Sequence, residues 1–189
     1  MALKDLVCEE IRCEHLVRDQ WIDFRRSAYR FPDGRIFEPY YSYTRRDYAV
    51  IVASDEAGSF LCVRQFRQGI RQVTTEFPAG GIERKDGEAC TLEQALTAAQ
   101  RELREETGYT ADEWTDIGDF HPAPAYSDEY ITMYLARGLH KGEQHLDEDE
   151  FLDVYTIPLA DLVNDVMNGT VSDAKTQVCI LKAARILGI

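Results

Sequence analysis

One strong amphipathic helix in the middle of the chain most restricts the possible folds. Thr91-Leu92-Glu93-Gln94 has the pattern of a capping box, and Gly108 suits the left-handed conformation that follows a helix end. We therefore predict a helix that starts just after Thr91 and ends at about Thr107. One side of it carries apolar residues at helical spacing, which predicts packing on a sheet: Leu92, Ala95, Leu96, Ala99 and Leu103.

Segments rich in β-branched and aromatic residues surround this helix and are predicted to be strands. They are residues 21–31, 35–46, 48–54, 60–66, 114–122, 129–139 and 151–159. Turn sequences at 32–34 and 55–58 predict two hairpins. Apolar residues at helical spacing predict two closing helices, within 159–169 and 173–187, separated by Asn168-Gly169. Together these elements predict a mixed α+β sandwich.

The length of 189 residues suits one catalytic domain with an appendage. We divide the chain into an N-terminal β arm, residues 1–46, and a core domain, residues 47–189. The chain lacks the run of about 18 apolar residues needed to cross a bilayer. Charges also interrupt the first apolar residues, so the N-terminus lacks a signal-peptide core. We expect a cytoplasmic protein that does not bind membranes.

The net charge of −13 argues against nucleic acid as a partner, because binding to a phosphate backbone depends largely on Lys and Arg. The five cysteines are scattered and form no C-x-x-C pair: Cys8, Cys13, Cys62, Cys90 and Cys179. This pattern predicts neither a disulfide framework nor a zinc site. A phosphate-ester substrate would need divalent cations to offset the local negative charge.

The end of the central helix concentrates negative charge. Glu102, Glu105 and Glu106 lie close together there, although like charges at this spacing repel and the helix macrodipole opposes them. Glutamates one turn apart point the same way, so their oxygens can converge on a hard cation such as Mg²⁺. Arg101 precedes Glu105 by one turn and can orient it. A charged, solvated helix end is the alternative interpretation of these residues.

The wider spacing resembles the signature of a known family. Gly87, then Glu93 after five residues, then Arg101-Glu-Leu-Arg-Glu-Glu-Thr-Gly-Tyr109 after seven more, resembles the box of the Nudix hydrolases. Upstream, "EFPAGGIE" at 76–83 is similar to a segment of the ADP-ribose pyrophosphatase branch. Pro124, sixteen residues past Gly108, matches the proline of that branch.

This resemblance implies a Nudix fold, a mixed β-sheet sandwiched between helices (α/β/α), with an N-terminal antiparallel β arm. It implies Mg²⁺-dependent hydrolysis of ADP-ribose to AMP and ribose 5-phosphate, with Mn²⁺ as an alternative ion. A nucleoside diphosphate sugar hydrolase acting on GDP-mannose or an ADP-sugar is the nearest alternative. A Nudix-fold module that senses a ligand without chemistry is a remote one.

The resemblance also implies roles for particular acidic residues. Glu102 and Glu106 would be the principal metal ligands, joined by the carbonyl of Ala79. Glu105 would be a further metal ligand, or a base that contacts the ligands without binding the metal itself. In the acidic segment "HLDEDEFLDV" (145–154), alignment of the strand that follows selects Glu148 as the catalytic base and Glu150 as a metal ligand. A shift by one or two residues would select Asp147 or Asp149 instead.

Substrate contacts are implied in the same way. Arg67 would hold the diphosphate, Glu129 the ribose portion and Glu76 the purine. We expect a homodimer built by the arm, whose aromatic residues could stack the base: Trp21, Phe24, Tyr29, Phe31, Tyr40, Tyr41 and Tyr43.

Overall fold

The computed structural model describes residues 6–83, 90–148 and 150–188. Its strands are β1 (Glu9–Arg18), β2 (Asp23–Arg30), β3 (Ile36–Thr44), β4 (Tyr48–Ala53), β5 (Ser59–Arg67), β6 (Gln72–Glu76), β7 (Ala79–Gly81), β8 (Tyr109–Phe120), β9 (Ile131–Lys141) and β10 (Leu152–Pro158). Its helices are α1 (Leu92–Thr107), α2 (Leu159–Met167) and α3 (Ala174–Leu187). Gly87 and Asp149, both singled out above, lie outside the described residues.

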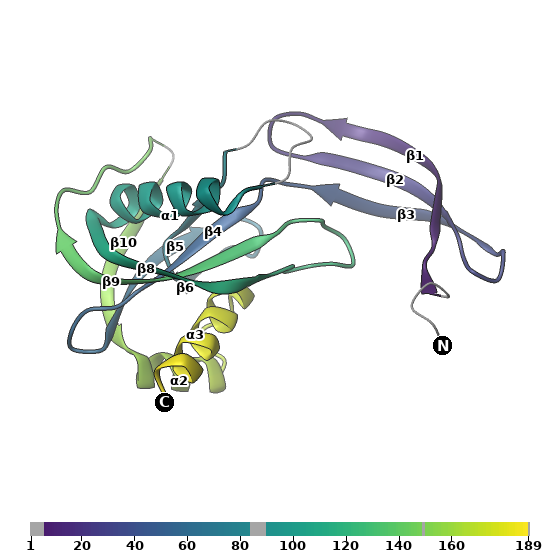
Figure 1. The fold of residues 1–189 in the computed structure, drawn as a ribbon. Coiled ribbons are helices and arrows are strands. Elements are labelled where there is room, and N and C mark those ends of the chain that lie inside the picture. Colours follow the sequence, from purple (N-terminus) through teal and green to yellow (C-terminus); the bar gives the residue numbers. More distant parts are fainter. Residues whose placement is uncertain (1–5, 84–89, 149, 189) are drawn as a thin grey trace. The chain divides into compact units, whose positions relative to one another are not determined.

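The chain forms two compact units, of which the first combines Met1–Arg46 with His121–Glu129. Strands β1, β2 and β3 form an antiparallel sheet in that order (Figure 1). The segment 121–129 is bonded to this sheet, because the N–H of Tyr43 donates to the carbonyl of Tyr126 (2.7 Å) and the Tyr40 hydroxyl donates to the carbonyl of Ala125. The division of the chain at residue 46 did not include this distant segment.

Strand β1 was not predicted, because its sequence EEIRCEHLVR has no buried face: all ten residues are exposed. Backbone pairing with β2 holds it, and exposed ion pairs across the two strands accompany this pairing. Glu9 and Arg30 are register partners, and the pair is joined by a 2.5 Å ion pair. Glu14 pairs in the same way with Arg26.

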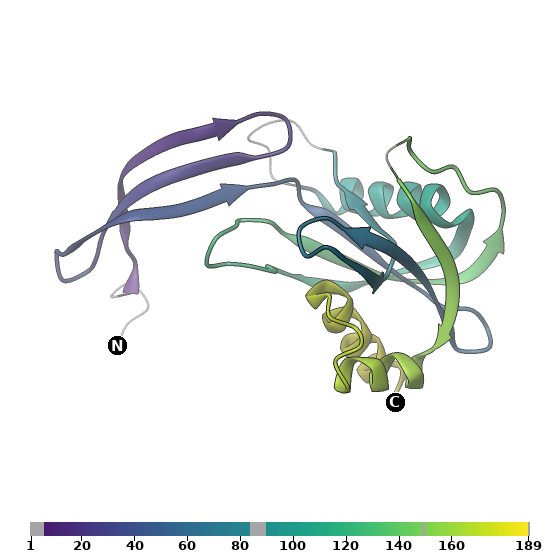
Figure 2. The same cartoon turned by 180° about the vertical axis from the view of Figure 1, so that it is seen from behind.

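The second unit combines Asp47–Phe120 with Tyr130–Ile189. A mixed sheet of order β7-β4-β9-β8, in which β4 and β9 run parallel, lies beside an antiparallel sheet of order β10-β5-β6. Helix α1 covers one side of the sheet layer, and α2 and α3 cover the other (Figure 1; Figure 2 gives the view from behind). The α+β class and the α/β/α layering of the prediction are confirmed.

Alternation along β4 fills both halves of the core. Val50 and Val52 pack in the cluster that contains α2 and α3, whereas Ala49 and Ile51 pack in the cluster of α1. A strand covered on both faces must be apolar at every position, which explains the continuous apolar run in its sequence. Among the described residues, no helix combines the length and apolar character that a membrane crossing requires.

Helix α1 starts and ends where the sequence predicts. The Thr91 side chain accepts from the backbone N–H of Gln94 (3.2 Å), and the Gln94 side chain accepts from the N–H of Thr91 (2.9 Å), which completes the capping box. Gly108 adopts φ 75°. The predicted packing face is wrong at Leu92, which is 67 % exposed; the buried side starts one turn later, at Ala95.

The second predicted hairpin is also wrong in its pairing. Strands β4 and β5 follow one another through a turn, but they share only an isolated bridge between Ser54 and Phe60 and then enter different sheets. Strands β6 and β7 were not predicted. Their sequences QVTTE and AGG are too short to show a clear alternation.

Candidate metal and active site

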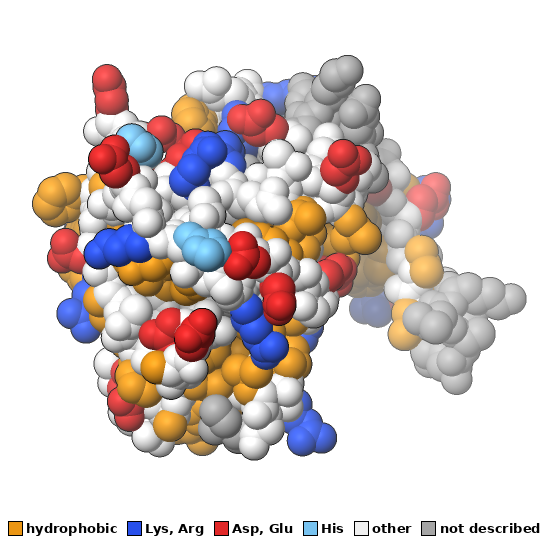
Figure 3. Space-filling view, turned by 60° about the vertical axis from the view of Figure 1, so that its left-hand side comes forward, with side chains coloured by type: hydrophobic (Ala, Val, Ile, Leu, Met, Phe, Trp, Pro, Cys, Tyr) orange, Lys and Arg blue, Asp and Glu red, His pale blue; other side chains and the backbone are white. Residues whose placement is uncertain are grey.

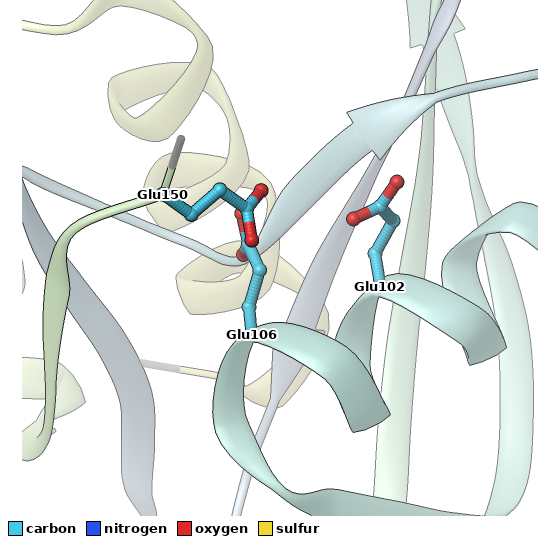
Figure 4. Close-up of side chains that lie close together, drawn as sticks. All are labelled: Glu102, Glu106 and Glu150. Carbon is cyan, nitrogen blue, oxygen red and sulfur yellow. The ribbon is translucent and has the colours of Figure 1, made fainter. Parts of the chain in front are cut away.

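Three glutamates from two parts of the chain meet in the second unit. Glu102 and Glu106 extend from α1, and Glu150 extends from the segment just before β10 (Figure 4). Each offers a carboxylate oxygen, and these oxygens all lie within 4.8 Å of one another. The spacing of four residues places Glu102 and Glu106 on one side of the helix, one turn apart.

The cluster is electrostatically costly without a counter-charge. Glu106 is 3 % exposed, and burial, followed by the charges of Glu102 and Glu150, raises its pKa well above the usual value. Burial likewise raises the pKa of Glu102, although Arg101 opposes the shift. The site therefore favours either a bound proton or a bound cation.

The Glu102 side chain occupies space that a glycine leaves free. Gly80 in β7 lies so close that a Cβ atom there would be 1.8 Å from the Glu102 carboxyl group. Arg101 also holds this carboxylate, through a 2.5 Å bond from Nη2. The same guanidinium donates to Glu105 through Nη1 (2.7 Å), as the helical spacing predicts.

Ala79, also in β7, contacts the cluster through its backbone N–H, which donates to Oε2 of Glu106 (3.1 Å). This bond opposes the rise in the pKa of Glu106. The predicted role of the Ala79 carbonyl as a metal ligand stays a prediction.

Glu105 and Glu148 lie outside the three-carboxylate group. Glu105 is bonded to Arg101, while Glu148 is exposed on the segment between β9 and β10. Glu150 is oriented locally, because the N–H of Asp147 donates to its carboxylate (3.1 Å). The sequence pattern alone left this segment's register open.

Arg67 and Glu76 form a bidentate ion pair on the neighbouring strands β5 and β6. The guanidinium donates from Nε to Oε1 (2.6 Å) and from Nη2 to Oε2 (2.5 Å), and the Thr74 hydroxyl donates to the same carboxylate (2.5 Å). Burial alone would raise the pKa of Glu76, but Arg67 and Thr74 outweigh it, and the pKa is lowered. Glu76 is 1 % exposed, so its carboxylate is turned toward Arg67 rather than toward solvent.

Glu129 belongs to the first unit, in the segment 121–129. Its N–H donates to the Ser127 hydroxyl (3.0 Å), and its carbonyl bonds to the ring of His121 (2.9 Å). Next to it, a pocket of about 360 Å³ lies between this segment and strands β2 and β3. Its lining includes Tyr29, Tyr40 and Pro124, which the sequence singled out, and further residues that it did not indicate, which are Arg25, Ser42, His121, Ala125, Tyr126, Ser127 and Asp128.

Several arm aromatics pack against one another. Phe24 stacks on Tyr41 with ring centroids 5.7 Å apart, and Tyr29 meets Tyr40 edge to face at 5.4 Å. Trp21 lies under the guanidinium of Arg46, which is 5.6 Å from the ring centroid. Packing within the arm therefore accounts for part of the aromatic content.

The chemistry of the glutamate cluster fits Mg²⁺, a hard ion that binds oxygen ligands at about 2.1 Å. Ligand oxygens around such an ion are separated by about 3 Å when adjacent and about 4 Å when opposite. The cluster's carboxylate oxygens lie within 4.8 Å of one another, which is close to these separations. The raised pKa values of Glu102 and Glu106 also identify groups that gain from a nearby cation.

An α/β/α sandwich with acidic side chains converging at the end of its central helix is the architecture of a metal-dependent phosphohydrolase class. The chain belongs to the Nudix family, since the model of the NUDIX domain matches residues 44–176. It is 33 % identical over 180 residues to the ADP-ribose pyrophosphatase of Bacillus subtilis (strain 168), covering 94 % of this chain and 93 % of the relative.

One further relative and one solved structure extend the comparison. The GDP-mannose pyrophosphatase of Cronobacter sakazakii (strain ATCC BAA-894) is 26 % identical, covering 75 % of this chain and 74 % of the relative. A crystal structure of an ADP compounds hydrolase superposes with a TM-score of 0.81 at 22 % identity, covering 96 % of this chain and 94 % of that chain. This similarity confirms the Nudix fold.

Proposed function

We propose that this enzyme hydrolyses the pyrophosphate bond of ADP-ribose to AMP and ribose 5-phosphate with Mg²⁺, or with Mn²⁺ in its place. The convergence of Glu102, Glu106 and Glu150 carries this proposal. The substrate class is supported by the nearly full-length similarity to an ADP-ribose pyrophosphatase. Retention of every box glutamate argues against a ligand-sensing module without chemistry.

Glu102, Glu106 and Glu150 would hold the metal, with the carbonyl of Ala79 as a further ligand. Bound Mg²⁺ would supply charge stabilisation at the phosphoryl oxygens and would lower the pKa of bound water. The chain's own contribution is to hold the carboxylates in place before binding: Arg101 orients Glu102, and the N–H of Ala79 orients Glu106.

Glu148 is our proposed general base. Glu105 would lie next to the metal ligands without binding the metal itself. Glu148 is exposed and lies two residues before Glu150, so its carboxylate can accept a proton from the attacking water near the cluster. Glu105 is bonded to Arg101, which suits a residue that orients the guanidinium rather than one that takes the proton. Asp147 stays the alternative base, because its bond to the Glu150 carboxylate comes from its backbone N–H and does not involve its own carboxylate.

Arg67 would hold the diphosphate, since a guanidinium donates to phosphate oxygens in a fork. Its partner Glu76 is buried, and both oxygens of the Glu76 carboxylate accept hydrogen bonds from Arg67. We therefore propose that Glu76 orients Arg67 and does not contact the purine. Glu129 stays our proposed contact to the ribose portion.

The arm, residues 1–46, would build a homodimer and contact the nucleobase of the substrate, and residues 47–189 would form the hydrolase domain. Its strands expose apolar side chains that a second copy could cover, which are Ile11, Leu16, Val17, Ile36, Phe37 and Tyr41. Sedimentation of the Val17→Lys variant tests this: we expect a shift to monomer, and an unchanged mass would contradict it.

We propose small molecules, and not nucleic acid, as the ligands. The net charge is −13, and Figure 3 shows acidic side chains scattered among the basic ones on the face it presents. A nucleic-acid site instead concentrates Lys and Arg.

The decisive experiment is a substrate panel with ADP-ribose, GDP-mannose, ADP-glucose and 8-oxo-dGTP. Phosphatase releases inorganic phosphate from the monoester products of the three doubly esterified diphosphates but not from the intact substrates. The terminal phosphate of 8-oxo-dGTP is itself open to phosphatase, so hydrolysis of this substrate is followed by chromatography of its nucleotide product. We expect the highest kcat/KM with ADP-ribose and a requirement for Mg²⁺. A higher value with GDP-mannose would favour the second candidate, a nucleoside diphosphate sugar hydrolase, which the more distant GDP-mannose pyrophosphatase similarity supports.

A further inference from the structure

The segment between β9 and β10 is bonded to the C-terminal end of α1. The N–H of Gly142 donates to the carbonyl of Gly108 (2.7 Å), and the N–H of His145 donates to the carbonyl of Glu105 (3.0 Å). The last carbonyls of a helix have no partner within the helix. These backbone bonds therefore complete the helix end and fix the start of the segment against it.

Gln144 adds a side-chain bond at the same place. Its Nε2 donates to the backbone carbonyl of Glu106 at 2.5 Å. Glu106 is one of the clustered glutamates, and the segment that carries Gln144 continues to Glu150, another of them. This side-chain bond adds to the two backbone bonds that connect the helix supplying two carboxylates to the segment supplying the third.

Close packing at this junction leaves little room for another arrangement. Gly108 has φ 75°, and a Cβ atom there would lie 2.9 Å from the backbone nitrogen of Gln144. A glycine is required on both counts. Further along, the N–H of Glu150 donates to the carbonyl of Asp147 (3.0 Å), and Asp147 in turn donates to the Glu150 carboxylate (3.1 Å). Hydrogen bonds thus fix both the start of the segment, at the helix end, and its turn at Asp147 and Glu150.

We propose that Gln144 is a positioning residue for the metal site. By bonding the Glu106 carbonyl it holds the segment on the helix and so keeps Glu150 within reach of Glu102 and Glu106. The inference rests on the proposed function in so far as the cluster binds a divalent cation. It goes further by assigning the geometry of the cluster to a residue outside the box and outside the ligand set.

The test compares two replacements of Gln144 in the full-length chain. Gln144→Met keeps a similar length but removes the donor, whereas Gln144→Lys keeps an N–H donor beside the helix end, where a cation is favoured. Gln100→Met is the matched control, because Gln100 is exposed on the same helix. We expect Gln144→Met to weaken Mn²⁺ binding, followed by electron paramagnetic resonance, by about 10-fold. Gln144→Lys should recover most of the affinity.

Hydrogen exchange of the metal-free protein gives a second readout that does not depend on activity. Peptides covering residues 142–148 should exchange faster in Gln144→Met than in wild type, while peptides from α2 and α3 report that the fold is intact. Unchanged exchange, or faster exchange with unchanged Mn²⁺ affinity, would overturn the proposal.

Glu106→Gln separates the two possible failures. If Glu106→Gln loses Mn²⁺ binding while Gln144→Met retains it, the role of Gln144 is wrong and the metal site stands. If Glu106→Gln also retains Mn²⁺ binding, the proposed metal site is wrong, and the inference falls with it.

Discussion

Gly80 lies directly against the carboxyl group of Glu102. A Cβ atom at Gly80 would be 1.8 Å from both Cδ and Oε1 of Glu102, whereas real Cβ atoms essentially never approach other heavy atoms within 3.0 Å. The two residues come from different elements, β7 and α1, so the space for one ligand is set by the backbone of a neighbouring strand.

Gly80→Ala should therefore displace the Glu102 carboxylate. We expect the Mg²⁺ concentration for half-maximal hydrolysis to rise by about 10-fold, as for the loss of a group that orients a ligand. Gly69→Ala is the control, because a Cβ at Gly69 would meet no heavy atom within 4 Å. Equal Mg²⁺ titration curves for the two variants would contradict the assignment of Glu102.

Glu106→Gln should remove most Mg²⁺-dependent hydrolysis while the protein stays folded. The amide keeps the volume but loses the charge that a divalent ion requires, and we expect kcat/KM to fall by roughly 100-fold or more. Glu113→Gln, an exposed position on β8, serves as control. Unchanged turnover of Glu106→Gln would rule out the metal assignment.

The buried Glu106 should make the metal-free protein less stable as pH rises. Its pKa is raised in the folded state, chiefly by burial and then by Glu102 and Glu150, so the folded state binds more protons than the unfolded state. Its contribution is complete below the unfolded pKa of about 4.5 and is lost as pH rises through the folded pKa, by at most about 1.4 kcal/mol per pH unit for one proton. Urea unfolding in EDTA should show this slope for wild type relative to Glu106→Gln.

Adding Mg²⁺ should oppose that loss, because the ion binds the ionised carboxylates and stabilises only the folded state. A wild-type free energy of unfolding that rises with pH relative to Glu106→Gln, without metal, would refute the electrostatic account.

Arg67→Met should destabilise the fold as well as weaken substrate binding. It leaves the buried carboxylate of Glu76 without its bidentate partner, and we expect a loss of about 2 kcal/mol, below the full value for a buried pair because Arg67 is partly exposed. The depressed pKa of Glu76 means that the pair's contribution is present above pH about 4.5 and disappears as pH falls.

The double variant Arg67→Met/Glu76→Gln should regain part of the stability but not the substrate affinity. Urea unfolding and KM measure the two effects separately. Additive losses of stability in the double variant would show that the two side chains act independently.

Glu148→Gln should lower kcat strongly with little change in KM, since a base acts in the chemical step. We expect a loss of roughly 100-fold or more. Asp147→Asn is the comparison within the same segment, and should have the smaller effect. The opposite order would transfer the base to Asp147.

Local patterns predicted the central helix closely because its signals are local. The capping box, the glycine at its end and the apolar spacing all act within a few residues of one another, and Thr91–Gln94 and Gly108 behave as expected. Strand β1 gave no such signal, because it has no buried face and pairs with β2 through its backbone, accompanied by exposed ion pairs such as Glu14 to Arg26. The partition of β4 and β5 between two sheets depends on strands much later in the chain.

The sequence by itself determined the chemistry available to this protein: the glutamates of α1, their spacing of one turn and their Nudix signature. The family resemblance selected Glu150 as a ligand, but only the tertiary structure decided that its carboxylate lies with those of Glu102 and Glu106 and that Glu105 stays outside this group. It also decided that Glu76 is buried against Arg67. Spacing along a helix is set by a repeat of 3.6 residues, whereas contacts between distant segments depend on strand order and on how loops dock.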